Sequence, residues 1–110
     1  MEVKATAKGI RLSPQKARRI VDTVRGKKAD EALAALNFMS SPNARTVSRV
    51  VKSAVSNAEN NFQMVPSDLR IVRAYVDEGV RMKRISFKGR GRVNPILKRF
   101  CHITIVVEET

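Results

Sequence analysis

The chain has 110 residues, a hydrophobic content of 43% and a formal net charge of +12. This length suits a single domain, and this much apolar sequence excludes wholesale disorder. No apolar run approaches the ~20 residues of a membrane helix, and the N-terminus lacks the apolar core of a signal peptide. The excess positive charge favours a polyanion as the partner, either nucleic acid or an anionic membrane surface.

The first predicted element is an edge strand close to the N-terminus. Apolar and polar residues alternate from Val3 to Lys8, and the lysines Lys4 and Lys8 are suited to guard an open sheet edge. Gly9 is expected to end this strand.

A helix is predicted directly after it. Ser13 is the expected N-cap and Pro14 the first helical residue. Apolar residues then recur at the i, i+3, i+4 and i+7 positions counted from Ala17, as on one face of a helix. Gly26 is the expected stop.

Two more helices should follow. The second covers about residues 29–39 and has two acidic residues in its first turn, where the helix dipole favours them. The third starts at the serine-serine-proline run of residues 40–42, with a serine cap followed by Pro42, and extends to about Asn60, with an apolar stripe of alanines and valines. Its opposite stripe contains three cations, Arg45, Arg49 and Lys52.

Alternating, β-branched runs at residues 69–76 and 103–107 predict two further strands. The order of one strand, three helices and two strands implies a three-stranded antiparallel sheet with helices on one face, an α+β fold. We expect one domain over residues 1–110, with a body formed by residues 1–78 and 100–110 and an extended β-hairpin at about residues 79–99.

The predicted hairpin is strongly basic. Residues 79–99 hold no acidic residue and eight basic ones: Arg81, Lys83, Arg84, Lys88, Arg90, Arg92, Lys98 and Arg99. The rest of the chain carries 14 basic and 10 acidic side chains, a net charge of only +4. If pairing continues outward from Asp77 to Gly89, the hairpin reaches roughly 40 Å at about 3.3 Å per residue and projects from the body.

A two-stranded ribbon of like charges is marginal in water and needs a polyanion to bind. Arginine outnumbers lysine in it, which suits bidentate phosphate contacts and stacking on bases. Gly89 and Gly91 can supply the positive φ angles of a tip. Phe87 is placed to stack on a base, whereas Phe100 is expected to belong to the core.

No arrangement of residues typical of catalysis is present. His102 is the only histidine, and a structural or RNA-contacting role suits it better than base catalysis. Asp77 and Glu78 could hold a metal, but ion pairing with Arg81 or Lys98 is the simpler interpretation. The single cysteine, Cys101, excludes an internal disulfide and is expected to be a small buried residue at the start of a strand. We therefore predict no enzyme activity, catalytic residue, metal, cofactor or small-molecule substrate.

Several motifs resemble one family, the L-twenty-two (uL-twenty-two) family of bacterial large-subunit ribosomal proteins. The resemblance covers essentially the whole chain. It is carried by Ser13-Pro14-Gln15-Lys16-Ala17-Arg18, Arg25-Gly26-Lys27-Lys28, Ser53-Ala54, Asn57-Ala58-Glu59-Asn60, Val76-Asp77-Glu78-Gly79, Met82-Lys83-Arg84-Ile85, Gly91-Arg92, Ile96-Leu97-Lys98-Arg99 and His102-Ile103-Thr104.

The resemblance implies a structural constituent of the large subunit of the cytoplasmic ribosome. Its expected partners are 23S rRNA, bound early in assembly, neighbouring large-subunit proteins and the nascent peptide, with no membrane. The hairpin tip would line the peptide exit tunnel, and tip changes in the family are linked to macrolide resistance. The tip residues are Phe87, Lys88, Gly89, Arg90, Gly91 and Arg92, and many relatives carry a Met-Pro-Arg-Ala-Lys-like run where this chain has residues 86–90.

We expect rRNA contacts from all eight hairpin cations and from four cations of the first helix: Lys16, Arg18, Arg19 and Arg25. Two other functions compete with this interpretation. A DNA-binding regulator with a β-ribbon reader is the stronger rival, but the chain lacks a helix-turn-helix motif or an obvious dimer surface. A small ribonuclease would need an acid–base pair that the sequence does not offer.

Overall fold

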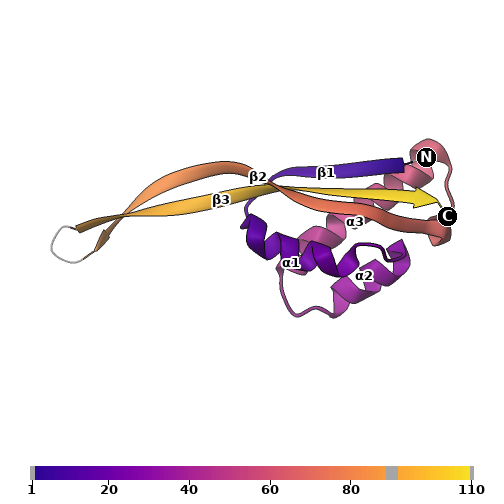
Figure 1. The fold of residues 1–110 in the computed structure, drawn as a ribbon, viewed down its shortest axis with the longest axis horizontal. Helices are drawn as coiled ribbons and strands as arrows, with labels where there is room; N and C mark the ends of the chain where they lie inside the picture. Colours follow the sequence, from indigo (N-terminus) through magenta and orange to yellow (C-terminus); the bar gives the residue numbers. More distant parts are fainter. Residues whose placement is uncertain (1, 89–91, 110) are drawn as a thin grey trace.

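The computed structural model describes the backbone of residues 2–88 and 92–109 and the side chains of residues 2–79 and 98–109. Seven elements follow one another along the chain (Figure 1): β1 (Glu2–Ile10), α1 (Pro14–Val24), α2 (Ala29–Phe38), α3 (Asn43–Phe62), the short 3-10 helix η1 (Pro66–Asp68), β2 (Leu69–Lys88) and β3 (Arg92–Glu109). Three helices and three strands in this order confirm the predicted α+β class.

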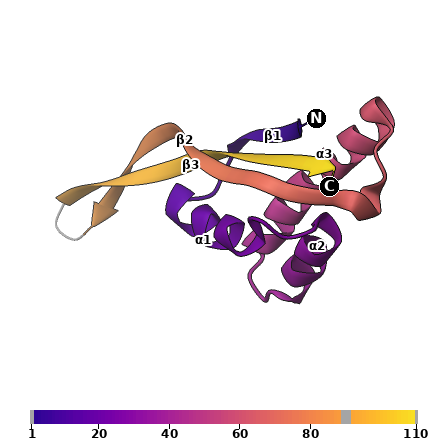
Figure 2. The same ribbon diagram turned by 45° about the vertical axis from the view of Figure 1, so that its right-hand side comes forward.

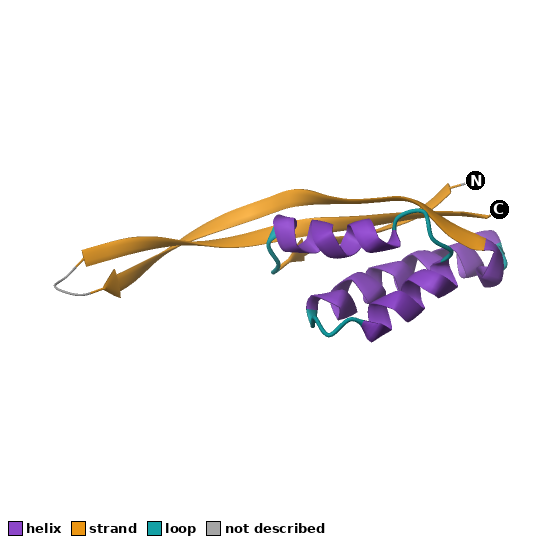
Figure 3. Cartoon of the chain, turned by 60° about the horizontal axis from the view of Figure 1, so that its bottom comes forward, coloured by secondary structure: helices purple, strands orange, loops and turns teal. Residues whose placement is uncertain are grey.

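The three strands form one antiparallel sheet in the order β1-β3-β2, so β3 is central and the other two are edge strands. Figures 1 and 2 show α1 and α2 below the sheet, with α1 alongside β2, and α3 crossing behind the strands toward the end at which both termini lie. Figure 3 shows the same layering from another side. The body therefore has two layers, with its core between the helices and one face of the sheet.

The backbones of β2 and β3 continue beyond the helices as a two-stranded ribbon (Figure 1). Their pairing runs from Leu69↔Glu109 to Lys88↔Arg92. The molecule measures 61 × 26 × 18 Å, and its radius of gyration of 16.9 Å exceeds the about 13 Å of a compact domain of this length.

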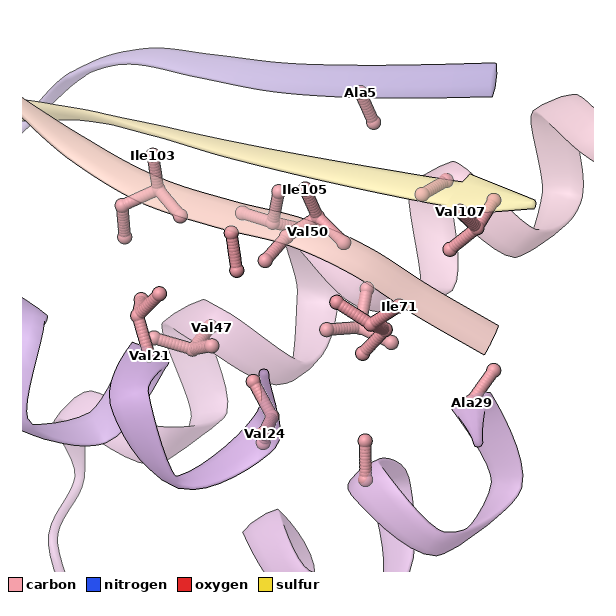
Figure 4. Close-up of a cluster of buried hydrophobic side chains, with 14 of the residues drawn as sticks. Ala5, Val21, Val24, Ala29, Val47, Val50, Ile71, Ile103, Ile105 and Val107 are labelled. Carbon is pink, nitrogen blue, oxygen red and sulfur yellow. The ribbon is translucent and has the colours of Figure 1, made fainter. Parts of the chain in front are cut away.

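The core consists almost entirely of aliphatic side chains. Ile103, Ile105 and Val107 of β3 point from the sheet toward Val21 and Val24 of α1 and Val47 of α3 (Figure 4), and all six are fully buried. Burying one such side chain stabilises a fold by about 1.5–3 kcal/mol. The valines of α3, which are mediocre helix formers, owe their helical state to this packing.

The predicted helix ends differ from the observed ones by one to two residues. Helix α2 ends at Phe38, and α3 begins at Asn43, after Pro42; the Ser41 hydroxyl accepts a hydrogen bond from the Asn43 amide at 3.3 Å. Helix α3 also continues past Asn60 to Phe62, because the stop is the left-handed residue Gln63 (φ +54°), not the asparagine pair.

Gly9 does not end the first strand, as the sequence suggested. Strand β1 continues to Ile10, and its pairing shifts by a bulge between Ala7↔Ile103 and Ile10↔Cys101. Gly9 has φ +67°, a conformation that glycine adopts without steric cost. Its amide donates to Nδ1 of His102 at 3.0 Å, which gives this histidine the structural role considered above.

Cys101 is fully buried, as predicted, although it lies within β3 and not at its start. Burial raises the pKa of its thiol, so the neutral form is favoured. These properties fit a small core residue and not a reactive thiol.

Gly79 has a steric requirement that leads to a prediction. It lies in a bulge of β2 between Glu78↔Cys101 and Arg81↔Arg99, and a Cβ added there would lie 3.1 Å from both the carbonyl carbon and oxygen of Phe100. We expect Gly79→Ala to lower the unfolding free energy by about 1–2 kcal/mol, because the contact is with backbone atoms, which cannot rotate away as the end of a side chain could. Urea unfolding measures this, with exposed Ser67→Ala as the control. Equal stability of both variants would contradict the tight contact.

Candidate nucleic-acid interface

Most of the predicted RNA-binding cations of the hairpin lie where side chains are not described. The backbone places Arg81, Lys83, Arg84 and Lys88 on β2 and Arg92 on β3. Their side chains and that of Phe87 lie outside the described residues, and Gly89, Arg90 and Gly91 lie wholly outside them. The contacts expected of these residues therefore stay predictions.

The root of the hairpin is described in full. Arg99 is exposed and Lys98 partly exposed. Arg99 and Arg18 line a hollow of about 240 Å³ together with Pro14, Gln15, Glu78, Gly79 and Phe100. Phe100 is only partly buried and lies outside the core, contrary to expectation; it lines this hollow, to which α1 contributes only Pro14, Gln15 and Arg18.

Two predicted RNA-binding residues of α1 are hydrogen-bonded to β2. Arg18 donates through Nε and Nη2 to the Val76 carbonyl, at 3.3 and 3.1 Å. Arg25 donates in the same way to the Ala74 carbonyl, at 3.0 and 2.6 Å, and pairs with Asp22 at 2.9 Å. These guanidinium groups therefore join the helix to the root of the hairpin.

Both arginines bond to the outer edge of β2, the edge that faces away from β3. The loop that follows α1 bonds to the same edge further along the strand. The Gly26 amide donates to the Ile71 carbonyl, and the Ile71 amide donates to the Lys27 carbonyl, both at 2.9 Å. Backbone groups at an open edge invite pairing with other chains. The loop and the two arginines thus cover this edge over residues 71–76.

The other two predicted cations of α1, Lys16 and Arg19, are exposed. They line a hollow of about 380 Å³ with Ile20, Ser41 and Asn43, beside the start of α3. The positive end of the α3 dipole favours an anion here, and so do the two cations. This hollow can accept a phosphate group.

A larger hollow, of about 420 Å³, lies between the end of α2 and α3. Its cations are Arg45, Arg49 and Lys52, the stripe recognised in the sequence, and its other lining residues include the hydroxyl groups of Ser40, Ser41 and Ser48. Ser41 lines both hollows. Sequence periodicity predicted the stripe but not its junction with α1, which depends on how the helices cross. The serine run at residues 40–41 was recognised only as a helix start.

Sequence reasoning also missed an ion pair on the open face of the sheet. Arg73 of β2 donates through Nη2 to both carboxylate oxygens of Glu2 on β1, each at 2.7 Å. The hydrogen bond and charge of Glu2 raise the pKa of the Arg73 guanidinium above its usual value. The partners are 71 residues apart, so no local pattern could have revealed them.

Among the described residues, no group of three or more His, Cys, Asp or Glu side chains is arranged to hold a metal ion. No helix in this part of the chain is long and apolar enough to cross a membrane.

The division between bonded and free cations on α1 gives a testable difference. Arg18→Ala/Arg25→Ala removes the bonds to β2 and should lower the unfolding free energy by roughly 2 kcal/mol, at about 1 kcal/mol per hydrogen-bonded side chain. Lys16→Ala/Arg19→Ala should change it by less than about 0.5 kcal/mol. Chemical denaturation of both double variants makes the comparison. Equal stabilities would mean that the arginine bonds do not hold the edge of β2.

Comparison with known proteins identifies the family. The sequence profile of the family described as ribosomal protein L22p/L17e matches residues 5–108. The chain is 56% identical over 109 residues to large ribosomal subunit protein uL22 of Dehalococcoides mccartyi, covering 99% of this chain and all of the relative. It is 50% identical to the protein of that name from Thermotoga sp., covering 99% of this chain and 69% of the relative, and 46% identical to that of Halothermothrix orenii, covering 99% and 96%.

These matches confirm the resemblance found in the motifs. They also confirm that the protein is a structural protein of the cytoplasmic ribosome and not an enzyme, and rRNA binding is general for such proteins. The chain belongs to the uL22 family of large-subunit ribosomal proteins.

Proposed function

We propose that this protein joins segments of 23S rRNA in the large subunit through two basic surfaces, the hairpin and the helical side of the body. One observation carries the proposal. Eight basic residues and no acidic one occur at residues 79–99, on two strands whose backbones pair outward from the body as far as Lys88↔Arg92. Like charges this dense oppose one another unless phosphates separate them.

The mechanism is charge neutralisation where RNA segments converge. Arginine suits this work because its planar guanidinium binds phosphate oxygens in a bidentate way. Contacts to six to eight phosphates would give a slope of log affinity against log salt of about −4 to −7, at about −0.7 to −0.9 per contact. A protein that engages RNA over such a length is suited to bind early in assembly.

The body supplies the second surface. Arg45 and Lys52 of α3 and Lys16 and Arg19 of α1 line the two neighbouring hollows, and no hydrogen bond or ion pair within the described residues occupies them. The N-terminus of α3 lies between them. We assign phosphate contacts to these four cations and a mainly structural role to Arg18 and Arg25.

Salt dependence tests the body surface. Arg45→Gln/Lys52→Gln should reduce the magnitude of the salt slope for 23S rRNA binding by about 1.4–1.8, which corresponds to two lost phosphate contacts. Lys27→Gln/Lys28→Gln removes the same charge from the exposed loop after α1 and is the matched control. An equal change of slope in both variants would mean that the cations of the α3 stripe contribute only non-specific charge and make no phosphate contacts of their own.

We further propose that the hairpin tip lines the nascent-peptide exit tunnel. What supports this is the family and the position of Lys88 and Arg92 at the far end of the paired strands. Deletion of residues 86–93 spares the core and leaves Arg81, Lys83, Arg84, Lys98 and Arg99 on the arms.

The deletion should therefore permit assembly of the large subunit while changing its tunnel. The expected result is normal subunit yield with an altered macrolide response or altered stalling of particular nascent chains. Purified ribosomes carrying the deletion are compared with wild type for both properties. Failed assembly would show that the tip is an assembly anchor; normal assembly with both tunnel properties unchanged would place the tip elsewhere.

A further inference from the structure

The two edge strands of the sheet, β2 and β1, differ in how many hydrogen bonds their outer edges receive. The edge of β2 is bonded by the loop at Gly26 and Lys27 and by the side chains of Arg25 and Arg18. Within the described residues, the other edge strand, β1, pairs only with β3, and the one backbone bond that it receives from a loop is from the Leu12 amide to the Ile10 carbonyl at its end. An antiparallel edge strand leaves about half of its N–H and C=O groups facing outward.

A groove runs beside this open edge. It has a volume of about 210 Å³ and lies between β1 and α3. Its lining from the strand is Ala5, Thr6, Ala7 and Ile10, and its lining from α3 is a single helical face, comprising Thr46, Arg49, Val50 and Ser53. These four positions have the i, i+3, i+4, i+7 spacing of neighbours on one side of a helix. The small alanines of β1 leave the space that the groove occupies.

The one charged residue among those that line the groove is a cation, Arg49. Lys4 and Lys8 alternate with the lining alanines and are exposed on the opposite face of the same strand. No acidic residue occurs between Glu2 and Asp22 or between Glu31 and Glu59, the two stretches that contain its walls. The wall itself is mostly carbon, which suits an apolar side chain and offers little to a phosphate group.

We propose that an extended segment of a neighbouring protein adds to β1 as a fourth strand. Its backbone would satisfy the free groups of β1, and its alternate side chains, small and apolar, would enter the groove, as in other cases of strand addition. The side chains between them would lie on the opposite face of the sheet beside Lys4 and Lys8, where carboxylates are favoured. A second copy of β1 does not fit, because its own lysines would face those of the first.

The groove shares Arg49 with the hollow between α2 and α3 but contains none of the four body cations assigned to phosphate contacts, so its test reads out a different contact. A photoreactive amino acid at Ser53, which lines the groove, is introduced into the full chain and activated in assembled large subunits. The same group at Ser56, exposed on α3 but absent from the groove lining, is the control. Amide exchange of β1 is measured in the free protein and in the subunit.

The expected result is a protein adduct from Ser53 and not from Ser56. It should map to one extended segment with carboxylates, and amides of β1 should exchange more slowly in the subunit. Lys4→Glu/Lys8→Glu should reduce the adduct several-fold, whereas Lys27→Glu/Lys28→Glu should not. An RNA adduct, a segment without carboxylates, or unchanged exchange of β1 would overturn the proposal. rRNA binding measured on the same variants shows separately whether the proposed function holds.

Discussion

The fold depends on the contact between the central strand and the helices. Ile103, Ile105 and Val107 of β3 are fully buried against aliphatic side chains of α1 and α3. Because β3 also pairs with both other strands, it fixes the positions of both edges at once. The hairpin is the outward continuation of this strand and of β2, so its base is held by the most buried part of the molecule. A two-stranded ribbon is only marginally stable alone, and here its base is held in place by the body.

Charged side chains lie outside the contact between β3 and the helices. The buried core holds no charged side chain among the described residues, and its few polar members are Ser48 and Thr104. The cations of α1 divide into two groups: Arg18 and Arg25 bond carbonyls of β2, while Lys16 and Arg19 remain exposed toward the start of α3. One helix therefore holds the root of the hairpin with two arginines and leaves two further cations exposed. Different side chains thus stabilise the fold and make the proposed phosphate contacts.

Local patterns in the sequence were sufficient for the elements and their class. The apolar periodicity of α3 and the alternation in β1 predicted both elements, and helix ends were missed by one to two residues because Asn60 and Ser41 permit several geometries. What sequence could not predict depends on strand register. The bulge after Ile71 decides which carbonyls of β2 face Arg18 and Arg25, and the bulge at Gly79 leaves Phe100 without a paired residue on β2. The pairing of Arg73 with Glu2 likewise requires three strands to be in place.

The most direct test is whether the body folds without RNA. Amide exchange of the isolated protein in RNA-free buffer can be followed residue by residue. Slow exchange in α3 and across residues 103–107 is expected, because these segments form the aliphatic contact on which the fold depends. Exchange there at the rate of an unfolded chain would contradict it. That result would mean that rRNA, and not the packing of β3 against the helices, determines the fold.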